Sequence, residues 1–300
     1  MITELSILIP VFNNDVRPLV TELHAQCRQQ AVKYEILLFD DASEERIRAI
    51  NRQLAELPHV IYQELPQNIG RAAIRNKLAT AAAYEYLLML DNDCLPSRKD
   101  FVSYYLHEAA GEAVVAGGVA YQQEAPDRIY RLHWKYGQRA AKTVDERRKE
   151  PYKNIFLSNV LVKKALFLQY QLCESLKDYG HEDTLFALQL ERQGVQVKHI
   201  ENPAVHLGLE PTDVFLAKTE QAVANLVKLY VRGEQLDTLK LVKAYKLLQE
   251  KGLEKSFLSA YRGMRKIIRK NLYATRPSMF FFDLYRLFLF TRKLQNDTQL

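Results

Sequence analysis

The sequence predicts an α/β fold in which a mostly parallel sheet is flanked by helices and followed by a helical C-terminal extension. Short, apolar, β-rich runs alternate with segments of helical spacing as far as residue 210. This alternation favours parallel strands joined by right-handed crossovers. From Thr212 onward only helical spacing remains. We therefore expect two domains, residues 1–210 and 211–300.

The expected strands are short apolar runs that end in polar, glycine or proline residues. In order, they lie at residues 5–12, 34–39, 60–62, 87–90, 113–120, 154–163 and 195–200. The expected helices between them carry apolar residues three or four positions apart. They lie at residues 19–27, 47–54, 72–83 and 101–109, with one more beginning near residue 180. Ser43 is expected to cap the second helix with its hydroxyl.

Four helices are expected in the extension, at residues 214–230, 236–248, 257–272 and 280–294. Cations are dense between Lys255 and Lys293, and aromatic residues are interleaved with them. A basic, aromatic, amphipathic helix can lie on an anionic membrane, so peripheral contact at the inner face of the cell membrane is one interpretation. Packing on the first domain and a dimer contact are the others, and the oligomeric state stays open. Nucleic acid is not expected, because no reading motif accompanies the charge.

The amino-acid composition limits the expected cellular compartment and the expected classes of binding partner. The 300 residues are 48% hydrophobic and 26% charged, which is ordinary for a globular chain, and the net charge is +6. A basic balance suits a nucleic acid, an anionic membrane or a phosphorylated substrate. The three cysteines are isolated, which excludes a zinc pattern and indicates a reducing compartment. No signal peptide and no apolar run of about 18 residues is found, so a cytoplasmic location is expected.

Residues 122–153 are polar and strongly charged. We expect a solvated surface segment there, with a mobile lid as the alternative. Trp134 is the only tryptophan of the chain. It is expected to be packed, although a platform for stacking a sugar is the alternative.

Two carboxylates follow the most apolar of the strands. Residues 87–90 run directly into Asp91-Asn92-Asp93, at a point where the chain bends. Two hard oxygen donors in one small volume suit Mg²⁺ or Mn²⁺, which bind through one or two carboxylates plus substrate phosphates. The alternative is a turn, because aspartate and asparagine also favour turns.

Other polar residues occupy equivalent places. Asn13 and Asp41 also follow expected strands, and ligands bind beyond the carboxyl ends of the strands in a parallel sheet. Glu182 and Asp183 begin a helix, where compensation of the helix dipole is a sufficient structural reason for them. His206 is a lone histidine in a loop. The clustering at strand ends predicts a ligand site there.

Five motifs follow one another along the chain: Ile7-Leu8-Ile9-Pro10-Val11-Phe12-Asn13, Phe39-Asp40-Asp41-Ala42-Ser43, Asn68-Ile69-Gly70-Arg71 with Arg75-Asn76, Leu90-Asp91-Asn92-Asp93 and Gly180-His181-Glu182-Asp183. Together they resemble an inverting family 2 glycosyltransferase of the GT-A fold, over about residues 3–208. They occur in the order expected of that family and are specific as a set. No motif is identified in the helical extension.

The resemblance implies roles for these residues. The donor-binding residues would be Pro10, Phe12, Asn13, Asp41, Gly70, Arg71, Arg75 and Asp91, with Asp41 at the base. Asp93, Asp91 and His206 would hold Mn²⁺ or Mg²⁺ at the donor diphosphate. Asp183 would be the general base, with Glu182 beside it. The charge on the leaving diphosphate and the proton of the acceptor hydroxyl call for these groups.

The function expected from the resemblance is transfer of a hexose from a nucleotide-sugar donor, UDP-linked by analogy, to a hydroxyl of a glycan or glycolipid, in surface polysaccharide synthesis. A sugar-nucleotidyltransferase is one rival, but the loop after the first strand lacks the glycines such an enzyme needs. A non-catalytic nucleotide-sugar-binding protein is the other rival. The donor sugar and the acceptor are not given by the sequence.

Overall fold

The computed structural model describes residues 1–176 and 179–297. Its contacts divide the chain into two compact units. The first unit comprises Met1–Gln122, Ala140–Lys177 and Glu182–Gly208, and the second comprises Gln123–Arg139, Asp178–His181 and Leu209–Leu300. The domain boundary between residues 210 and 211 stays a prediction. The division into units differs from it in assigning two short earlier segments to the second unit.

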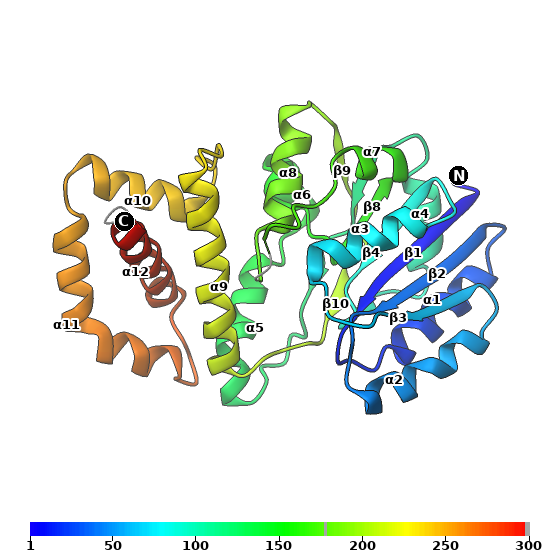
Figure 1. Ribbon diagram of the computed structural model, residues 1–300, viewed down its shortest axis with the longest axis horizontal. Helices are drawn as coiled ribbons and strands as arrows, with labels where there is room; N and C mark the ends of the chain where they lie inside the picture. The colour runs from blue at the N-terminus through cyan, green and yellow to red at the C-terminus, as the bar shows by residue number, and fades with distance from the viewer. Residues whose placement is uncertain (177–178, 298–300) are drawn as a thin grey trace. The chain divides into compact units, whose positions relative to one another are not determined.

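The first unit is built on a seven-stranded sheet with helices on both faces (Figure 1). The strands stand in the order β3 (Val60–Glu64), β2 (Lys33–Asp40), β1 (Glu4–Val11), β4 (Tyr86–Leu90), β8 (Asn159–Lys163), β6 (Val114–Ala116) and β9 (Val197–His199). β1 to β4 are mutually parallel, whereas β8 is antiparallel to both of its neighbours. The prediction of a mostly parallel sheet is therefore confirmed.

A smaller, three-stranded sheet lies in the same unit. It contains β5 (Cys94–Pro96), β10 (Ala204–His206) and β7 (Val119–Ala120), with β10 in the middle. β10 lies antiparallel to β5, and the register sets His206 opposite Cys94. This pairing brings a late segment of the chain next to the residues that follow β4. Residues 202–208, expected as a loop, thus contain a strand.

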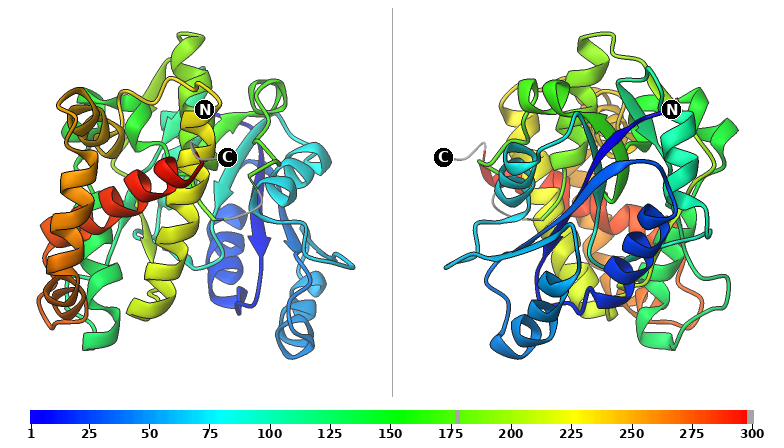
Figure 2. Two further views of the ribbon diagram at one scale, coloured as in Figure 1. Left: turned by 60° about the vertical axis from the view of Figure 1, so that its left-hand side comes forward. Right: turned by 90° about the vertical axis from the view of Figure 1, so that its right-hand side faces the viewer.

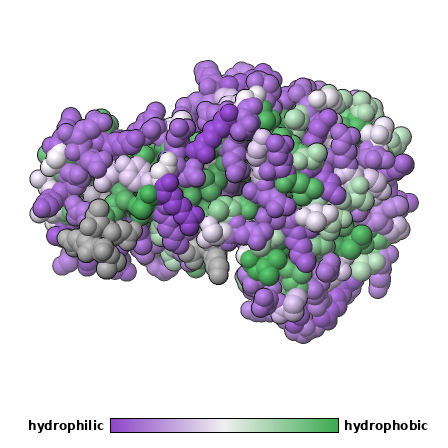
Figure 3. Space-filling model, turned by 45° about the horizontal axis from the view of Figure 1, so that its top comes forward, coloured by the Kyte–Doolittle hydropathy of each residue, from purple (hydrophilic) through white to green (hydrophobic). Residues whose placement is uncertain are grey.

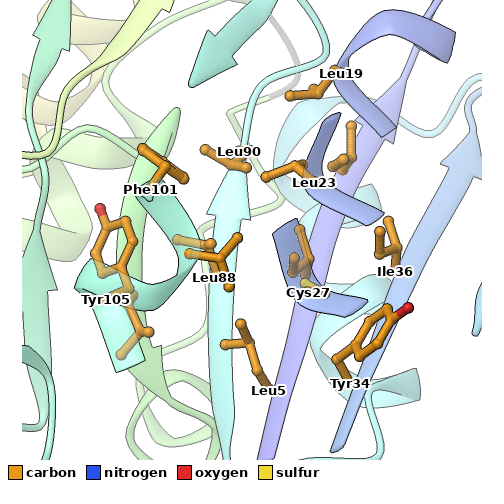
Figure 4. Packing of buried hydrophobic residues seen from close by; sticks show 14 of the residues in the cluster. Leu5, Leu19, Leu23, Cys27, Tyr34, Ile36, Leu88, Leu90, Phe101 and Tyr105 are labelled. Atoms are coloured by element: carbon orange, nitrogen blue, oxygen red, sulfur yellow. The ribbon is translucent and has the colours of Figure 1, made fainter. Parts of the chain in front are cut away.

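The helices of the first unit cover the two faces of the large sheet. They are α1 (Arg17–Arg28), α2 (Glu45–Asn51), α3 (Arg71–Ala81), α4 (Phe101–Glu108), α6 (Val144–Lys149), α7 (Lys164–Gln169) and α8 (Glu182–Arg192), with the 3₁₀ turns η1 (Arg52–Glu56) and η3 (Pro151–Asn154). Successive residues of a strand face opposite ways. Leu88 of β4 packs in a cluster with α1 and α4 (Figure 4), while Leu87 packs in a second cluster with α3. Each such fully buried side chain contributes about 1.5–3 kcal/mol.

Two local expectations about turns and strand ends were wrong. Glu44, not Ser43, takes the N-cap position of α2, and the Ser43 hydroxyl instead accepts a hydrogen bond from the Asn13 backbone amide at 2.8 Å. The expected strand at 113–120 is split into β6 and β7 at Gly117 and Gly118. Both glycines are tightly packed, and a Cβ at Gly117 would lie 2.2 Å from the Tyr105 hydroxyl.

Residues 122–153 are helical in part rather than a solvated segment throughout. They include η2 (Arg128–Tyr130), α5 (Arg131–Ala140) and α6. Arg147 of α6 is only 2% exposed. Its guanidinium donates to the carbonyl oxygens of Ala116 at 3.0 Å and Ile200 at 2.8 Å. A buried guanidinium that satisfies backbone carbonyls joins β6 to the segment after β9, which charge patterning along the sequence did not indicate.

The second unit is helical in the part that the structure describes, as expected. Besides η2 and α5 it contains α9 (Thr212–Val231), α10 (Lys240–Glu250), α11 (Glu254–Leu272) and α12 (Met279–Asp297). α12 packs against α9, α10 and α11 (Figure 2). Their core is aromatic: the rings of Phe215 and Phe282 stack at 5.5 Å. None of the helices in the described ranges is long and apolar enough to cross a bilayer. On the face drawn in Figure 3, hydrophilic residues predominate and hydrophobic ones form separate patches.

Candidate active site

The carboxyl ends of β1 and β2 meet at the start of the site. Val11 of β1 is in register with Asp40 of β2, and the Asp41 amide donates to the Val11 carbonyl at 2.8 Å. Asn13 adopts a left-handed conformation with φ +49°, which asparagine tolerates better than most residues. Its side-chain oxygen accepts the Glu44 amide at 2.8 Å. The two strand ends are therefore tied into one rigid edge.

Asp41 orders the turn that leads into α3. Its carboxylate accepts the backbone amides of Ile69 at 2.7 Å and Gly70 at 3.1 Å. Gly70 has φ +88°, a conformation that side-chain-bearing residues rarely adopt. Burial raises the pKa of Asp41, and the two amide hydrogen bonds oppose that rise. A contact from Asp41 to a nucleoside base stays a prediction, whereas the nearby Phe12 ring is 48% exposed and open to a ligand.

Two arginines of α3 converge on Asp91. Arg71 and Arg75 are one helical turn apart and therefore share a face. The buried Arg75 guanidinium donates to Asp91 Oδ1, and Arg71 Nη2 lies 3.5 Å from Asp91 Oδ2. Although burial favours the neutral carboxyl, the charges of Arg75 and Arg71 hold the pKa of Asp91 below its ordinary value. The strand end thus carries a carboxylate fixed in its ionised form beside two cations.

Glu182 and Asp183 begin α8 at the same cluster. Arg71 Nε donates to Glu182 Oε1 at 3.0 Å, so this arginine bridges Asp91 and Glu182. Asp183 is partly buried; loss of solvation first, and then repulsion from the Glu182 carboxylate, raise its pKa to about 7. Arg75, Arg71 and Asp91 also act on it electrostatically. A carboxyl with a pKa near neutrality can accept a proton at neutral pH, as a general base must.

Asp93 meets His206 across the small sheet. His206 Nε2 lies 3.4 Å from Asp93 Oδ2, and the Leu207 amide donates to the Asp93 carbonyl at 2.8 Å. The Tyr121 ring stacks on the His206 ring with centroids 5.2 Å apart. Burial raises the pKa of Asp93, although His206 opposes this. A Cβ at Gly208 would lie 2.2 Å from Asp93 Oδ2, so only glycine leaves room for this carboxylate.

The donor types at Asp93 and His206 fit a divalent cation. A carboxylate oxygen and an imidazole nitrogen are ligands that Mn²⁺ accepts. Over residues 1–176 and 179–297 no group of three or more His, Cys, Asp or Glu side chains is arranged so that it could hold a metal ion by itself. An ion held here would therefore take most of its ligands from water and from phosphate oxygens, as Mg²⁺ and Mn²⁺ commonly do.

The structure therefore brings most of the predicted site residues into neighbouring clusters of the first unit. Arg71, Arg75, Asp91, Glu182 and Asp183 form one cluster. Asp93 and His206 form a second, which is close enough for His206 to act on the Asp91 carboxyl. Asn13, Asp41 and Gly70 form the rim of the site, and Pro10 lies beside them near the end of β1. Sequence reasoning missed two residues that contact the Asp93–His206 pair, Tyr121 and Gly208. For Gly208, its position two residues after His206 could have indicated a place in the site; for Tyr121 the sequence offered no such signal.

Comparison with known proteins is consistent with this geometry. The sequence profile described as "Glycosyl transferase family 2" matches residues 6–167. Chondroitin synthase of Escherichia coli is 33% identical over 99 residues, which are 32% of this chain and only 14% of that protein. The chain therefore spans a small part of that relative.

Two solved structures are similar in fold. The mannosyltransferase PcManGT from Pyrobaculum calidifontis, in complex with GDP-Man and Mn²⁺, has a TM-score of 0.53 and 16% identity over 78% of this chain and 64% of that one. S. aureus TarS 1–349 in complex with UDP has a TM-score of 0.50 and 14% identity over 98% of this chain and 92% of that one. At these identities the likeness concerns the fold alone, which is the GT-A fold.

Proposed function

We propose that this chain, which belongs to glycosyl transferase family 2, transfers a hexose from a nucleotide-diphosphate donor to a hydroxyl of a glycan or glycolipid, with inversion at the anomeric carbon. One observation carries the proposal. Asp183, whose pKa is about 7, lies in the same cluster as the Arg71–Asp91–Arg75 ion pairs. A proton acceptor beside concentrated positive charge is what attack by a hydroxyl on a phosphate-linked sugar requires.

The donor nucleoside would lie along the rim formed by Pro10, Phe12, Asn13 and Asp41. The exposed Phe12 ring offers a face for the base. Gly70 lets the backbone approach the donor closely. A uridine nucleotide is proposed by analogy with the UDP-bound neighbour.

The diphosphate would lie beside the arginines and the Asp93–His206 pair. Arg71 is 44% exposed at its side chain, so it can turn from Glu182 toward a bound phosphate, whereas the buried Arg75 stays paired with Asp91. Asp93 and His206, with Asp91 nearby, would hold Mn²⁺ or Mg²⁺, which when bound neutralises charge on the leaving diphosphate. Asp183 would take the proton of the acceptor hydroxyl. At the same time the hydroxyl oxygen would bond to the anomeric carbon of the donor sugar, and the bond from that carbon to the diphosphate oxygen would break.

The donor-site proposal is tested by thermal stability with UDP, GDP, CDP and ADP, each with and without Mn²⁺. A ligand that binds only the folded state adds about 2.7 kcal/mol at 100 times its dissociation constant. A shift with one nucleotide that needs Mn²⁺ and disappears in Asp93→Ala supports the proposal. Folded protein that shifts with none of them overturns it. Pyrophosphate release from a nucleoside triphosphate would instead indicate a nucleotidyltransferase.

We also propose peripheral contact with an anionic membrane through α11 and the start of α12. Met264, Ile267 and Phe280 are apolar and exposed, Ile267 by 64% and Phe280 by 66%. Lysines and arginines accompany them on α11. Such a surface suits the boundary between lipid headgroups and acyl chains. Co-sedimentation with phosphatidylglycerol vesicles should weaken in Ile267→Asp; unchanged binding would exclude this surface.

A further inference from the structure

We propose that a pocket within the helical unit binds an oxyanion of the acceptor, which is either a carboxylate on a sugar or a phosphate ester. This inference rests on the proposed function, because it names the chemistry of the acceptor. The pocket has a volume of about 370 Å³ and is formed by α9, α11 and α12. That volume is at the lower end of the range for small-molecule sites and suits one or two sugar rings.

Three arginines line this pocket. Arg265 and Arg269 are one turn apart on α11, and Arg292 lies on α12. All three are exposed, and among the described residues none forms an ion pair with a carboxylate. Arginine recognises carboxylates and phosphates through two parallel hydrogen bonds. The pocket therefore presents guanidinium groups that have no acidic partner within the described chain.

The two carboxylates that line the pocket are already engaged. Asp213 of α9 accepts a hydrogen bond from the Tyr273 hydroxyl. Glu220, also of α9, accepts one from the Tyr285 hydroxyl at 2.7 Å. Both carboxylates lie on α9, whereas the three arginines lie on α11 and α12. The lining therefore carries one more positive than negative charge, which favours an anionic ligand.

Aromatic rings hold the guanidinium groups and supply an apolar surface. The Arg269 guanidinium carbon lies 5.8 Å from the Tyr273 ring centroid, and that of Arg292 lies 5.2 Å from the Phe288 centroid. Stacking on a ring leaves the edge of a guanidinium free for hydrogen bonds. The Tyr261 and Phe288 rings stack at 4.0 Å, which fixes the floor. A ring beside a guanidinium suits a sugar, whose C–H groups pack on the ring while its acidic group reaches the arginine.

A free glycan fits this pocket better than a lipid headgroup does. The acyl chains of a lipid would have to continue over exposed apolar surface. The exposed apolar side chains of α11, Met264 and Ile267, are not among the residues that line the pocket. The helix therefore separates a lipid-compatible surface from the arginine pocket. A carboxylated sugar and a polyol phosphate share the oxyanion chemistry, so both are used as probes.

The test is calorimetric titration of the full chain, without nucleotide or Mn²⁺, with a galacturonic acid hexamer and with a glycerol phosphate hexamer. The carboxyl-reduced galacturonate hexamer is the neutral control. We expect at least one anionic hexamer to bind and the neutral one not to bind. Loss of two charge-assisted contacts in Arg265→Ala/Arg269→Ala should weaken binding by at least about tenfold.

The matched control is Arg262→Ala/Lys266→Ala, which removes the same charge from exposed positions of α11 that do not line the pocket. Its affinity should stay within about twofold of the wild type, because a charge change outside the pocket alters only screened, long-range attraction. Equal losses in both double variants would overturn the proposal in favour of unspecific attraction. It is also overturned if neither hexamer binds, including the case in which phosphatidylglycerol vesicles bind through Arg265 and Arg269. Because no donor is present, a failure of UDP binding would refute the proposed catalysis and leave this result intact.

Discussion

Replacing Asp183 by asparagine separates the chemical role of this carboxylate from its cost to the fold. Burial and the neighbouring Glu182 raise the pKa of Asp183 from 3.8 to about 7. The ionised form is the base, so the transfer rate should rise about tenfold per pH unit below pH 7 and level off above it. Asparagine cannot accept the proton. We expect the transfer rate at pH 8 to fall by about 10²–10⁴-fold and its dependence on pH near 7 to disappear.

The same substitution should raise stability at alkaline pH. Well below pH 3.8 the carboxyl is protonated in the folded and unfolded chains alike. As pH rises toward 7 the folded chain retains a proton that the unfolded chain has released, so stability falls. A difference of about three pKa units corresponds to up to about 4 kcal/mol, which persists above pH 7. The Asp183→Asn variant would not incur this cost, because an asparagine side chain does not ionise.

The assay is transfer to a glycan acceptor together with thermal unfolding, each at several values between pH 5 and 8.5. Glu182→Gln is the informative control, since removing its charge lowers the pKa of Asp183 and moves the acidic limb of the rate profile to lower pH. The reasoning is refuted if Asp183→Asn retains transfer within a few-fold of the wild type. It is also refuted if that variant gains no stability between pH 5 and pH 8.

Two further predictions concern residues that sequence reasoning missed. Gly208→Ala places a Cβ against Asp93 Oδ2, so the affinity for nucleotide in the presence of Mn²⁺, measured by titration, should fall about tenfold or more. Gly263→Ala is the control, because its Cβ meets no atom within 4 Å, and it should leave this affinity unchanged. Equal effects of the two substitutions would contradict the steric argument. Arg147→Met removes the buried guanidinium hydrogen bonds to the carbonyls of Ala116 and Gly117, each of which keeps one backbone donor, and should lower the free energy of unfolding by about 1.5–3 kcal/mol in urea titrations. The exposed neighbour Arg148→Ala should change it by less than about 0.5 kcal/mol, and a similar loss in both would show that burial is not the reason.

The sequence predicted the framework because its signals are local. Apolar runs of the right length, alternating with helical spacing, indicate a parallel sheet regardless of how distant segments meet. Where each run ends follows from the same pattern, so the sequence alone suffices to place Asn13, Asp41 and Asp91 at strand ends. The mostly parallel sheet, the helical extension and the family were confirmed. The residue roles and the domain boundary remain predictions.

The tertiary structure alone decided which side chains meet. Arg71 and Arg75 can be placed on one helical face from their spacing, but their pairing with Asp91 depends on how α3 packs beside β4. His206 reaches Asp93 only because β10 pairs with β5 in one particular register, which no local periodicity encodes. Arg147 lies in a charged run that looks the same in sequence whether it faces water or, as here, backbone carbonyls. Local pattern located the long strands β1, β2 and β4 but missed β10 and the break between β6 and β7. Long-range register, which depends on packing of the whole sheet, determines what the residues at the strand ends touch.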